Sequence, residues 1–122
     1  MNITAAEEEL MKLLWERNPR PSEELVSELG PRMSWSETTI RTLLSRLVKK
    51  GAVAAEGEGR RFLYRPLVSR EDYLHSESRG LIERLFDGRV GPFVAQLSAR
   101  EKLSPEDIAE LKKLIEDLED GD

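Results

Sequence analysis

The chain has 122 residues, of which 39% are hydrophobic and 35% charged, so it can form one small domain, with or without an appendage, around a modest core. It has no cysteine and one histidine, which excludes disulfides, thiolate metal sites, a cysteine nucleophile and a histidine metal cluster. No apolar run approaches the roughly 18 residues of a membrane span, and the acidic N-terminus is unlike a signal peptide, so we expect a cytoplasmic protein.

The net charge of −5 is divided unevenly along the chain. Residues 1–31 carry −4, residues 32–70 carry +6, and residues 71–122 carry −7. Phosphate groups respond to a local patch more than to the total charge. The central segment is therefore a candidate for nucleic-acid binding within an acidic protein.

The first third of the chain predicts two helices. A capping box, Thr4-x-x-Glu7, opens the first helix, and the proline-containing segment 18–21 ends it. We expect Ser22 to cap the second helix and Gly30-Pro31 to close it.

A third helix is predicted over about residues 36–50, from an N-cap at Ser36 to a C-terminal cap at Gly51. Its apolar residues recur at the i, i+3, i+4, i+7, i+8 spacing of a buried face: Ile40, Leu43, Leu44, Leu47 and Val48. The opposite face has hydroxyls and cations and no acid: Thr38, Thr39, Arg41, Thr42, Ser45, Arg46 and Lys49. The alternative is a face that is merely solvated, and the hydroxyl residues argue against it because they lower helix propensity. A helix with this surface fits a DNA major groove.

After Gly51 the pattern becomes extended over about residues 52–65, with a glycine-bracketed turn at Gly57-Glu58-Gly59 and an end at Pro66. Three cations lie on or beside the second strand: Arg60, Arg61 and Arg65. A basic hairpin directly behind a recognition helix is the wing of a winged helix-turn-helix. The sequence thus predicts a mainly α fold with a small β-hairpin, in which residues 1–68 form a winged-helix DNA-binding domain.

Different contacts are expected from different parts of this surface. Arg41 or Arg46 can donate twice to guanine, whereas Lys49, Lys50 and the arginines of the wing are suited to phosphates. The candidate DNA-binding residues are Thr38, Thr39, Arg41, Thr42, Ser45, Arg46, Lys49, Lys50, Arg60 and Arg61. We expect Trp15 and Trp35 to pack in the core and the hinge rather than to stack on bases.

Residues 69–122 predict acidic helices whose apolar stripes are too short to be enclosed independently. The first is capped by Ser69 and ends at Asp87-Gly88, the second starts at Pro92, and the last is capped by Ser104. The stripes can pack back on the winged helix or pair with a second copy, and pairing is favoured because a twofold dimer reads two half-sites. The candidate dimerisation residues, over about residues 69–119, are Tyr73, Leu81, Leu85, Phe86, Phe93, Leu97, Ile108, Leu111 and Ile115.

No catalytic constellation is recognisable: the sequence has no glycine-rich phosphate loop, no Gly-x-Ser-x-Gly and no HExxH. We therefore expect a protein that is not an enzyme and has no cofactor or metal.

A close resemblance to the penicillinase-repressor family of bacterial winged-helix regulators is carried by three segments, EEELMKLLWE, WSETTIRTLLSRLVKKGAVAAEGEGRRFLYRPLVSREDYL and KLSPEDIAELKKLIEDL. The resemblance implies a homodimer that binds a short inverted repeat in promoter DNA and blocks transcription. It also implies a C-terminal dimerisation region, and often derepression through cleavage by a membrane metalloprotease.

Three departures from the family pattern bear on these expectations. Members often have a lysine near the position of Thr38, so the base preference is expected to differ. The bond cut in the best-known members joins Asn to Phe, and the matching candidate cleavage pair here is Gln96-Leu97. Copper-responsive members carry a C-terminal cysteine motif, so copper sensing of that type is excluded.

Two other functions stay open at the level of the sequence. One is a ligand-sensing regulator with a small-molecule pocket between the domains. The other is a winged helix used only for protein contacts, with the acidic C-terminal region as its docking surface.

Overall fold

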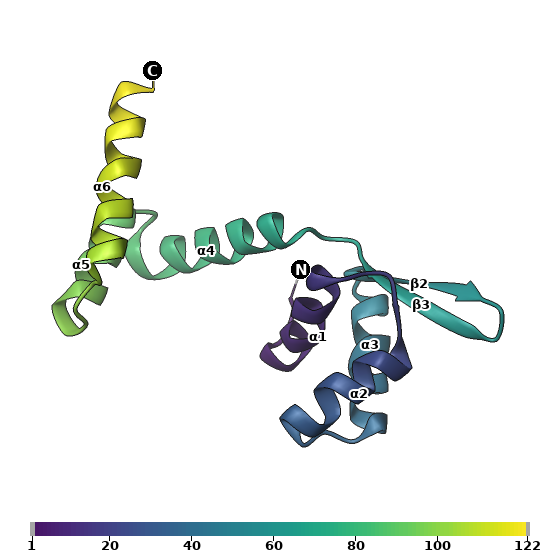
Figure 1. The fold of residues 1–122 in the computed structure, drawn as a ribbon. Helices are drawn as coiled ribbons and strands as arrows, with labels where there is room; N and C mark the ends of the chain where they lie inside the picture. The colour runs from purple at the N-terminus through teal and green to yellow at the C-terminus, as the bar shows by residue number, and fades with distance from the viewer. Residues whose placement is uncertain (1, 122) are drawn as a thin grey trace. The chain divides into compact units, whose positions relative to one another are not determined.

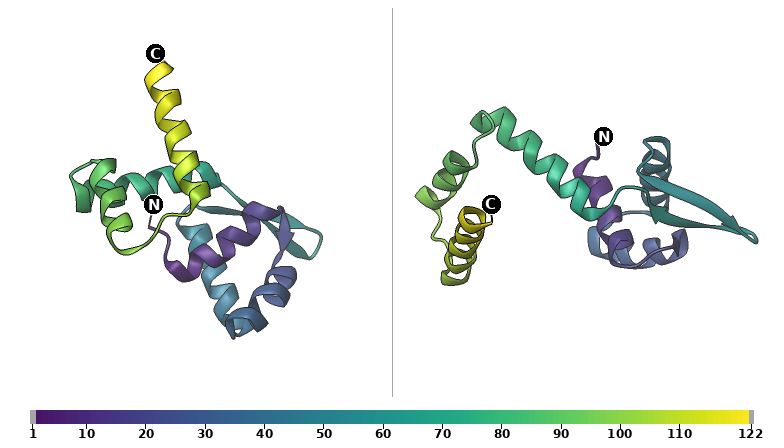
Figure 2. Two further views of the ribbon diagram at one scale, coloured as in Figure 1. Left: turned by 60° about the vertical axis from the view of Figure 1, so that its left-hand side comes forward. Right: turned by 90° about the horizontal axis from the view of Figure 1, so that it is seen from above.

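The structure, a computed structural model, describes residues 2–121 (Figures 1 and 2). Two compact units are present, Met1–His75 and Ser76–Asp122. The elements in chain order are α1 (Ala5–Glu16), β1 (Arg20–Pro21), α2 (Ser22–Met33), α3 (Glu37–Lys49), β2 (Val53–Glu58), β3 (Arg61–Pro66), α4 (Arg70–Phe86), α5 (Val90–Arg100) and α6 (Pro105–Asp120). The division between units falls inside α4, and a functional boundary after residue 68 stays a prediction.

The core of the first unit is formed by the apolar stripes of α1, α2 and α3. Its fully buried side chains include Leu10, Leu14, Leu25, Leu29, Ile40, Leu44 and Leu47. The predicted inner face of α3 is confirmed except at Val48, which is 37% exposed. Val48 lies eight residues after Ile40, so it is turned about 80° away from it around the helix axis and falls at the edge of the stripe.

The predicted N-caps of α1 and α3 are confirmed. Thr4 Oγ1 accepts from the Glu7 amide (3.1 Å), and the Thr4 amide donates to Glu7 Oε1 (2.8 Å). Ser36 Oγ accepts from the Thr39 amide (3.1 Å). Gly51, with φ of +80°, follows the C-cap of α3 as predicted, because a left-handed residue there favours glycine.

Both predicted ends of α2 are wrong. Ser22 is the first helical residue, and the N-cap is Pro21, which has no side-chain oxygen to offer. The helix continues through Pro31 to Met33 and ends at Ser34, which is left-handed. Gly30 instead allows α2 to pack closely against the turn that leads into α3, since an added Cβ would lie 3.3 Å from the Trp35 carbonyl oxygen.

The sheet has the strand order β1-β3-β2 and is antiparallel throughout. β2 and β3 form the predicted hairpin, which extends away from the three helices of this unit (Figures 1 and 2). Its turn is wrongly predicted: Gly57 and Glu58 continue β2, and the turn is made by Gly59 and Arg60. The short strand β1 was not predicted, and it pairs with β3 through Arg20 opposite Tyr64.

Arg20 ties β1 to the helices. Its side chain is only 2% exposed. The Nε atom lies 3.1 Å from Glu24 Oε2, and the Nη2 atom lies 2.5 Å from Glu28 Oε2. The Nη1 atom donates to the Leu13 carbonyl oxygen (3.4 Å). Burial lowers the pKa of Arg20, but the bonds to the two carboxylates outweigh it, so the pKa is raised and the charge is retained. The segment that ends α1 thereby becomes a fixed part of the sheet.

The second unit consists of the remainder of α4 together with α5 and α6. The predicted end of α4 is confirmed, with positive φ at Asp87 (52°) and Gly88 (80°). The predicted cap of α6 is also confirmed, since Ser104 Oγ accepts from the Asp107 amide (3.0 Å). The predicted start of α5 at Pro92 is wrong, because the helix begins at Val90. Pro92 is tolerated in the first turn, since an N–H group at that position would have no helical partner.

Among residues 2–121, no helix is long and apolar enough to cross a membrane. The same residues contain no group of three or more histidine, cysteine, aspartate or glutamate side chains arranged to hold a metal ion.

Candidate nucleic-acid interface

The exposed side of α3 collects most of the predicted DNA-binding residues. Five of them lie within an arc of about 100° around the helix axis: Thr38, Thr42, Ser45, Arg46 and Lys49. All five are exposed, because the apolar stripe on the other side of the helix is buried in the core. Thr39 and Arg41 flank this arc and are exposed as well.

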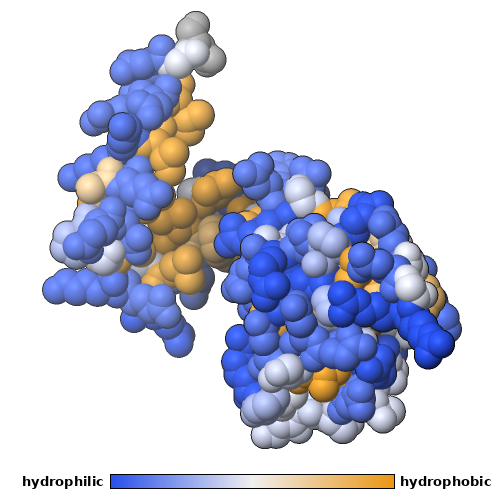
Figure 3. Space-filling model, turned by 45° about the vertical axis from the view of Figure 1, so that its right-hand side comes forward, coloured by the Kyte–Doolittle hydropathy of each residue, from blue (hydrophilic) through white to orange (hydrophobic). Residues whose placement is uncertain are grey.

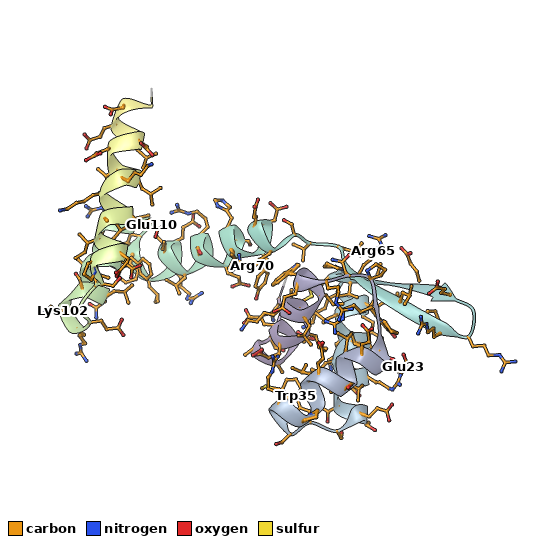
Figure 4. The ribbon with its side chains drawn as sticks, in the orientation of Figure 1. Glu23, Trp35, Arg65, Arg70, Lys102 and Glu110 are labelled. Carbon is orange, nitrogen blue, oxygen red and sulfur yellow. The ribbon has the colours of Figure 1, made fainter. Side chains whose placement is uncertain are left out.

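Three cations of this surface have no acidic partner among the residues that the structure describes: Arg46 and Lys49 on α3, and Arg60 in the hairpin turn. Arg61 lies 3.9 Å from Glu58, but both side chains are more than half exposed, and such a pair is worth little in water. Arg65, labelled in Figure 4, is paired with Glu56 across the hairpin (2.7 Å). These unpaired cations can therefore attract phosphates without first breaking an internal bond.

Lys50, also a candidate DNA-binding residue, differs from these three cations because it has an internal acidic partner. Its ammonium nitrogen lies 2.6 Å from Glu7 Oε1 and 2.7 Å from the Asn2 carbonyl oxygen. Glu7 is 1% exposed and the Lys50 side chain is 31% exposed, so this ion pair between the start of α1 and the end of α3 is buried on the side of Glu7. Lys50 neutralises an internal carboxylate, and a contact of its ammonium group with a phosphate stays a prediction.

The pKa of the Glu7 carboxyl reflects this arrangement. Burial raises the pKa, but the hydrogen bond from Lys50 and the bonds from Thr4 outweigh burial, so the pKa lies below its ordinary value. Folding therefore favours the ionised form of the Glu7 carboxyl group over its protonated form.

Arg41 is also held by internal contacts, and its partner Glu37 was overlooked in the sequence, where this face was predicted to carry no acid. Arg41 donates to Glu37 Oε1 from Nε (3.1 Å) and Nη2 (2.9 Å), and to Ser22 Oγ from Nη1 (2.9 Å). The spacing of four residues between Glu37 and Arg41 was the available signal. The contact with Ser22 joins positions 19 residues apart, and no local pattern could have indicated it.

Trp15 and Tyr73 form a cluster inside the first unit. Trp15 Nε1 donates to the Val68 carbonyl oxygen (2.9 Å), and the two rings lie 5.4 Å apart. The Tyr73 hydroxyl donates to the Glu8 carboxylate. This confirms the packing role of Trp15, and Trp35 likewise packs against the core. Tyr73, predicted at a dimer interface, is 7% exposed and is part of this internal cluster instead.

The other candidate dimerisation residues lie in the second unit. Phe86 and Phe93 contact each other edge to face, with ring centroids 5.5 Å apart. Leu81, Phe86, Phe93 and Leu111 are half-buried, whereas Leu85, Leu97, Ile108 and Ile115 are exposed. Neither α5 nor α6 has a buried residue, and apolar side chains gather along one side of these helices (Figure 3).

The candidate cleavage pair, Gln96-Leu97, lies within α5, and both residues are exposed. A protease acts on extended backbone, so α5 would have to open locally before this bond could be cut. Cleavage at this position stays a prediction.

Three helices, a hairpin behind the third helix, and exposed cations on both define a winged helix-turn-helix protein. The similarity to known proteins extends over nearly the whole chain. Residues 3–117 match the family model of the penicillinase repressor. The penicillinase repressor of Bacillus licheniformis is 36% identical over 115 residues, which cover 94% of this chain and 90% of that protein. The methicillin resistance regulatory protein MecI of Mammaliicoccus sciuri is 30% identical, with 93% and 92% covered. The chain therefore belongs to the penicillinase repressor family, a family of transcriptional repressors.

Solved structures match the first part of the chain. The DNA-binding domain of the repressor BlaI has a TM-score of 0.55 and 42% sequence identity, covering 59% of this chain and 88% of that one. The monomeric form of Bacillus licheniformis BlaI in complex with the blaP half-operator has a TM-score of 0.54 and 41% identity, covering 60% and 89%. These matches confirm the predicted winged-helix fold.

The Glu7–Lys50 pair predicts a pH-dependent contribution to stability. Because the pKa of Glu7 is lowered on folding, its contribution is present above the pKa of the unfolded chain and is lost as the pH falls through the folded value, from about pH 5 downwards. Glu7→Gln should flatten the decline in the free energy of unfolding in this range. Urea unfolding followed by tryptophan fluorescence measures it, since Trp15 and Trp35 both lie in the first unit. Glu116→Gln on α6, an exposed carboxylate, is the control and should leave the slope unchanged.

Lys50→Ala should lower the free energy of unfolding at pH 7 by about 2 kcal/mol, because it leaves the buried Glu7 carboxylate without its cation. Lys49→Ala removes a lysine from the neighbouring, exposed position and should change stability little. Equal stabilities of the two variants would contradict the assigned role of Lys50.

Proposed function

We propose that this chain is a sequence-specific DNA-binding repressor that acts as a homodimer on an inverted-repeat operator. The observation that carries the proposal is the exposed face of α3, where Arg46 and Lys49 stand unpaired beside a row of hydroxyl groups. The solved monomeric form of BlaI, which is similar to the first part of this chain, is in complex with a half-operator, and this supports the use of α3 for DNA binding here. Because occupancy of a promoter excludes polymerase, such binding is sufficient for repression, and no enzymatic activity is required.

The two kinds of contact follow from the position of each residue. Thr38, Thr42 and Arg46 lie on the exposed side of α3 and are proposed to contact base edges in the major groove. Lys49, Arg60 and Arg61 are proposed to hold the sugar-phosphate backbone, with the hairpin as the wing. Thr39 and Ser45 can supply further hydroxyl contacts to either.

The second unit supports the proposal of a homodimer. Leu114, Ile115 and Leu118 are 52%, 54% and 75% exposed, and a groove of about 330 Å³ beside them is lined mainly by leucine and valine: Val94, Leu97, Leu103, Leu111 and Leu114. A twofold arrangement would bury this surface of each chain against the same surface of its copy. We assign residues 69–122 to dimerisation on this basis, with Leu81, Leu85, Phe86, Phe93, Leu97, Ile108, Leu111 and Ile115 as the contact residues.

Two parts of the proposal concern regulation in the cell. We place the protein in the cytoplasm, where promoter DNA is accessible.

We also propose that the protein is released from the operator through cleavage at Gln96-Leu97 by a membrane metalloprotease. This proposal rests on family membership and on the exposure of both residues. Cutting α5 would remove α6, and with it much of the apolar surface assigned to dimerisation.

DNA contacts are tested with a duplex selected from random DNA by this protein, compared with a scrambled duplex of equal length. Arg46→Ala and Thr42→Ala should reduce the preference for the selected duplex, whereas Lys49→Ala should weaken both duplexes similarly and lower the slope of log affinity against log salt by about one. Lys113→Ala on α6 is the matched control and should change neither quantity. The backbone role of Lys49 is refuted if its loss leaves affinity and salt dependence unchanged.

Dimerisation is tested by placing a charge on the apolar side of α6. Ile115→Asp should shift the chain from dimer to monomer at micromolar concentration, because an unpaired carboxylate would be buried in the interface. Sedimentation equilibrium measures the mass directly. Lys113→Asp introduces the same acid at an exposed, polar position and should remain dimeric. An unchanged mass for Ile115→Asp would exclude this surface as the interface.

A further inference from the structure

The guanidinium of Arg41 is fixed at the junction of α2 and α3. Nε and Nη2 both donate to one oxygen of Glu37, which is one turn earlier on the same helix, and Nη1 donates across to Ser22 on α2. All three nitrogens are therefore engaged, and two helices determine where the group lies. Arg46 and Lys49 on the same helix have no such restraint among the described residues.

These contacts leave part of the guanidinium available. A guanidinium has five N–H groups, and three are used, so each terminal nitrogen retains one donor. The Arg41 side chain is 47% exposed, which leaves room for an oxygen ligand at those donors. Two donors on adjacent nitrogens of a planar group match the spacing of phosphate oxygens.

Reading a base would require Arg41 to leave this position. Ser22 is 6% exposed, so its hydroxyl oxygen would lose a hydrogen-bond donor inside the protein. Glu37 would remain as an unpaired acid on the face of α3 that is proposed to approach DNA, where phosphates repel it. Both effects favour keeping Arg41 where it is while DNA binds.

We propose that Ser22 and Glu37 are positioning residues that hold Arg41 as a preorganised phosphate ligand, so that Arg41 contributes affinity for every DNA sequence rather than base readout. The inference rests on the proposed DNA-binding function and replaces the sequence-based assignment of Arg41 to guanine. A ligand group that is already fixed loses less conformational entropy when it binds, which is the advantage of the arrangement.

The decisive comparison is between Glu37→Gln and Glu37→Ala. Both remove the acid, but glutamine keeps an oxygen that can accept from Arg41 and alanine does not. Glu37→Gln should bind both the selected and the scrambled duplex about fivefold more tightly than Glu37→Ala. In an Arg41→Ala background the two variants should bind equally. A difference that persists without Arg41, or no difference in its presence, overturns the positioning role of Glu37.

Ser22→Ala is the second test, and it leaves the charge unchanged. It should weaken binding to both duplexes about threefold without altering the salt slope, and it should have no effect once Arg41 is alanine. A hydroxyl that only stabilised the fold would lower the unfolding midpoint and leave the affinity of the folded protein unchanged. Because Glu37 is exposed, its variants test the proposal even if Ser22→Ala folds poorly.

Arg41→Ala itself separates phosphate binding from base readout. It should weaken both duplexes similarly and lower the salt slope by about one. Loss of preference for the selected duplex would assign Arg41 to base readout and overturn the inference while leaving the proposed function intact. If the unmodified chain shows no salt-dependent binding to any duplex, and Lys49→Ala changes nothing, the proposed function fails together with the inference.

Discussion

Burial of the apolar stripe of α3 is the constraint on which the rest of the structure depends. Ile40, Leu44 and Leu47 are fully buried against α1 and α2, and this fixes the rotation of the helix about its axis. Once the rotation is fixed, the residues on the other side must be exposed together. Gly30 on α2 lies in ordinary contact with Ile40 and closely against the turn before α3, so the helix-turn-helix has little room for a larger residue at this position.

The basic residues of the central segment have different contacts in the folded chain. Lys50 neutralises Glu7 in the interior, and Arg41 is shared between Glu37 and Ser22. Arg46 and Lys49, one and two turns along the same helix, have no acidic partner among the described residues. Position in the fold therefore decides which of these cations has an internal partner, although all four residues lie within ten positions of one another.

Local patterns predicted most of the fold, and what they missed includes both local boundaries and contacts between distant segments. The caps at Thr4, Ser36 and Ser104 and the hairpin follow from spacing within a few residues, and they are confirmed. The strand β1, the Lys50–Glu7 pair and the internal position of Tyr73 beside Trp15 depend on contacts between distant segments, whereas the end of α2 at Ser34 is local. The Glu37–Arg41 pair could have been predicted from the sequence, because the two residues are four positions apart on one helix. The predicted outer face of α3 included only its cations and hydroxyl residues, so Glu37 was left out. The DNA-contact roles themselves stay predictions, since exposure alone does not identify a ligand.

The strand order β1-β3-β2 leaves β2 at the border of the sheet, with backbone groups that could pair with a strand of another molecule. β2 carries Glu56 and Glu58, and a glycine at position 57 interrupts its side chains. Charged side chains on a border strand disfavour pairing with another chain, and glycine weakens an extended strand. These features of β2 disfavour the addition of a strand from another molecule at this border of the sheet.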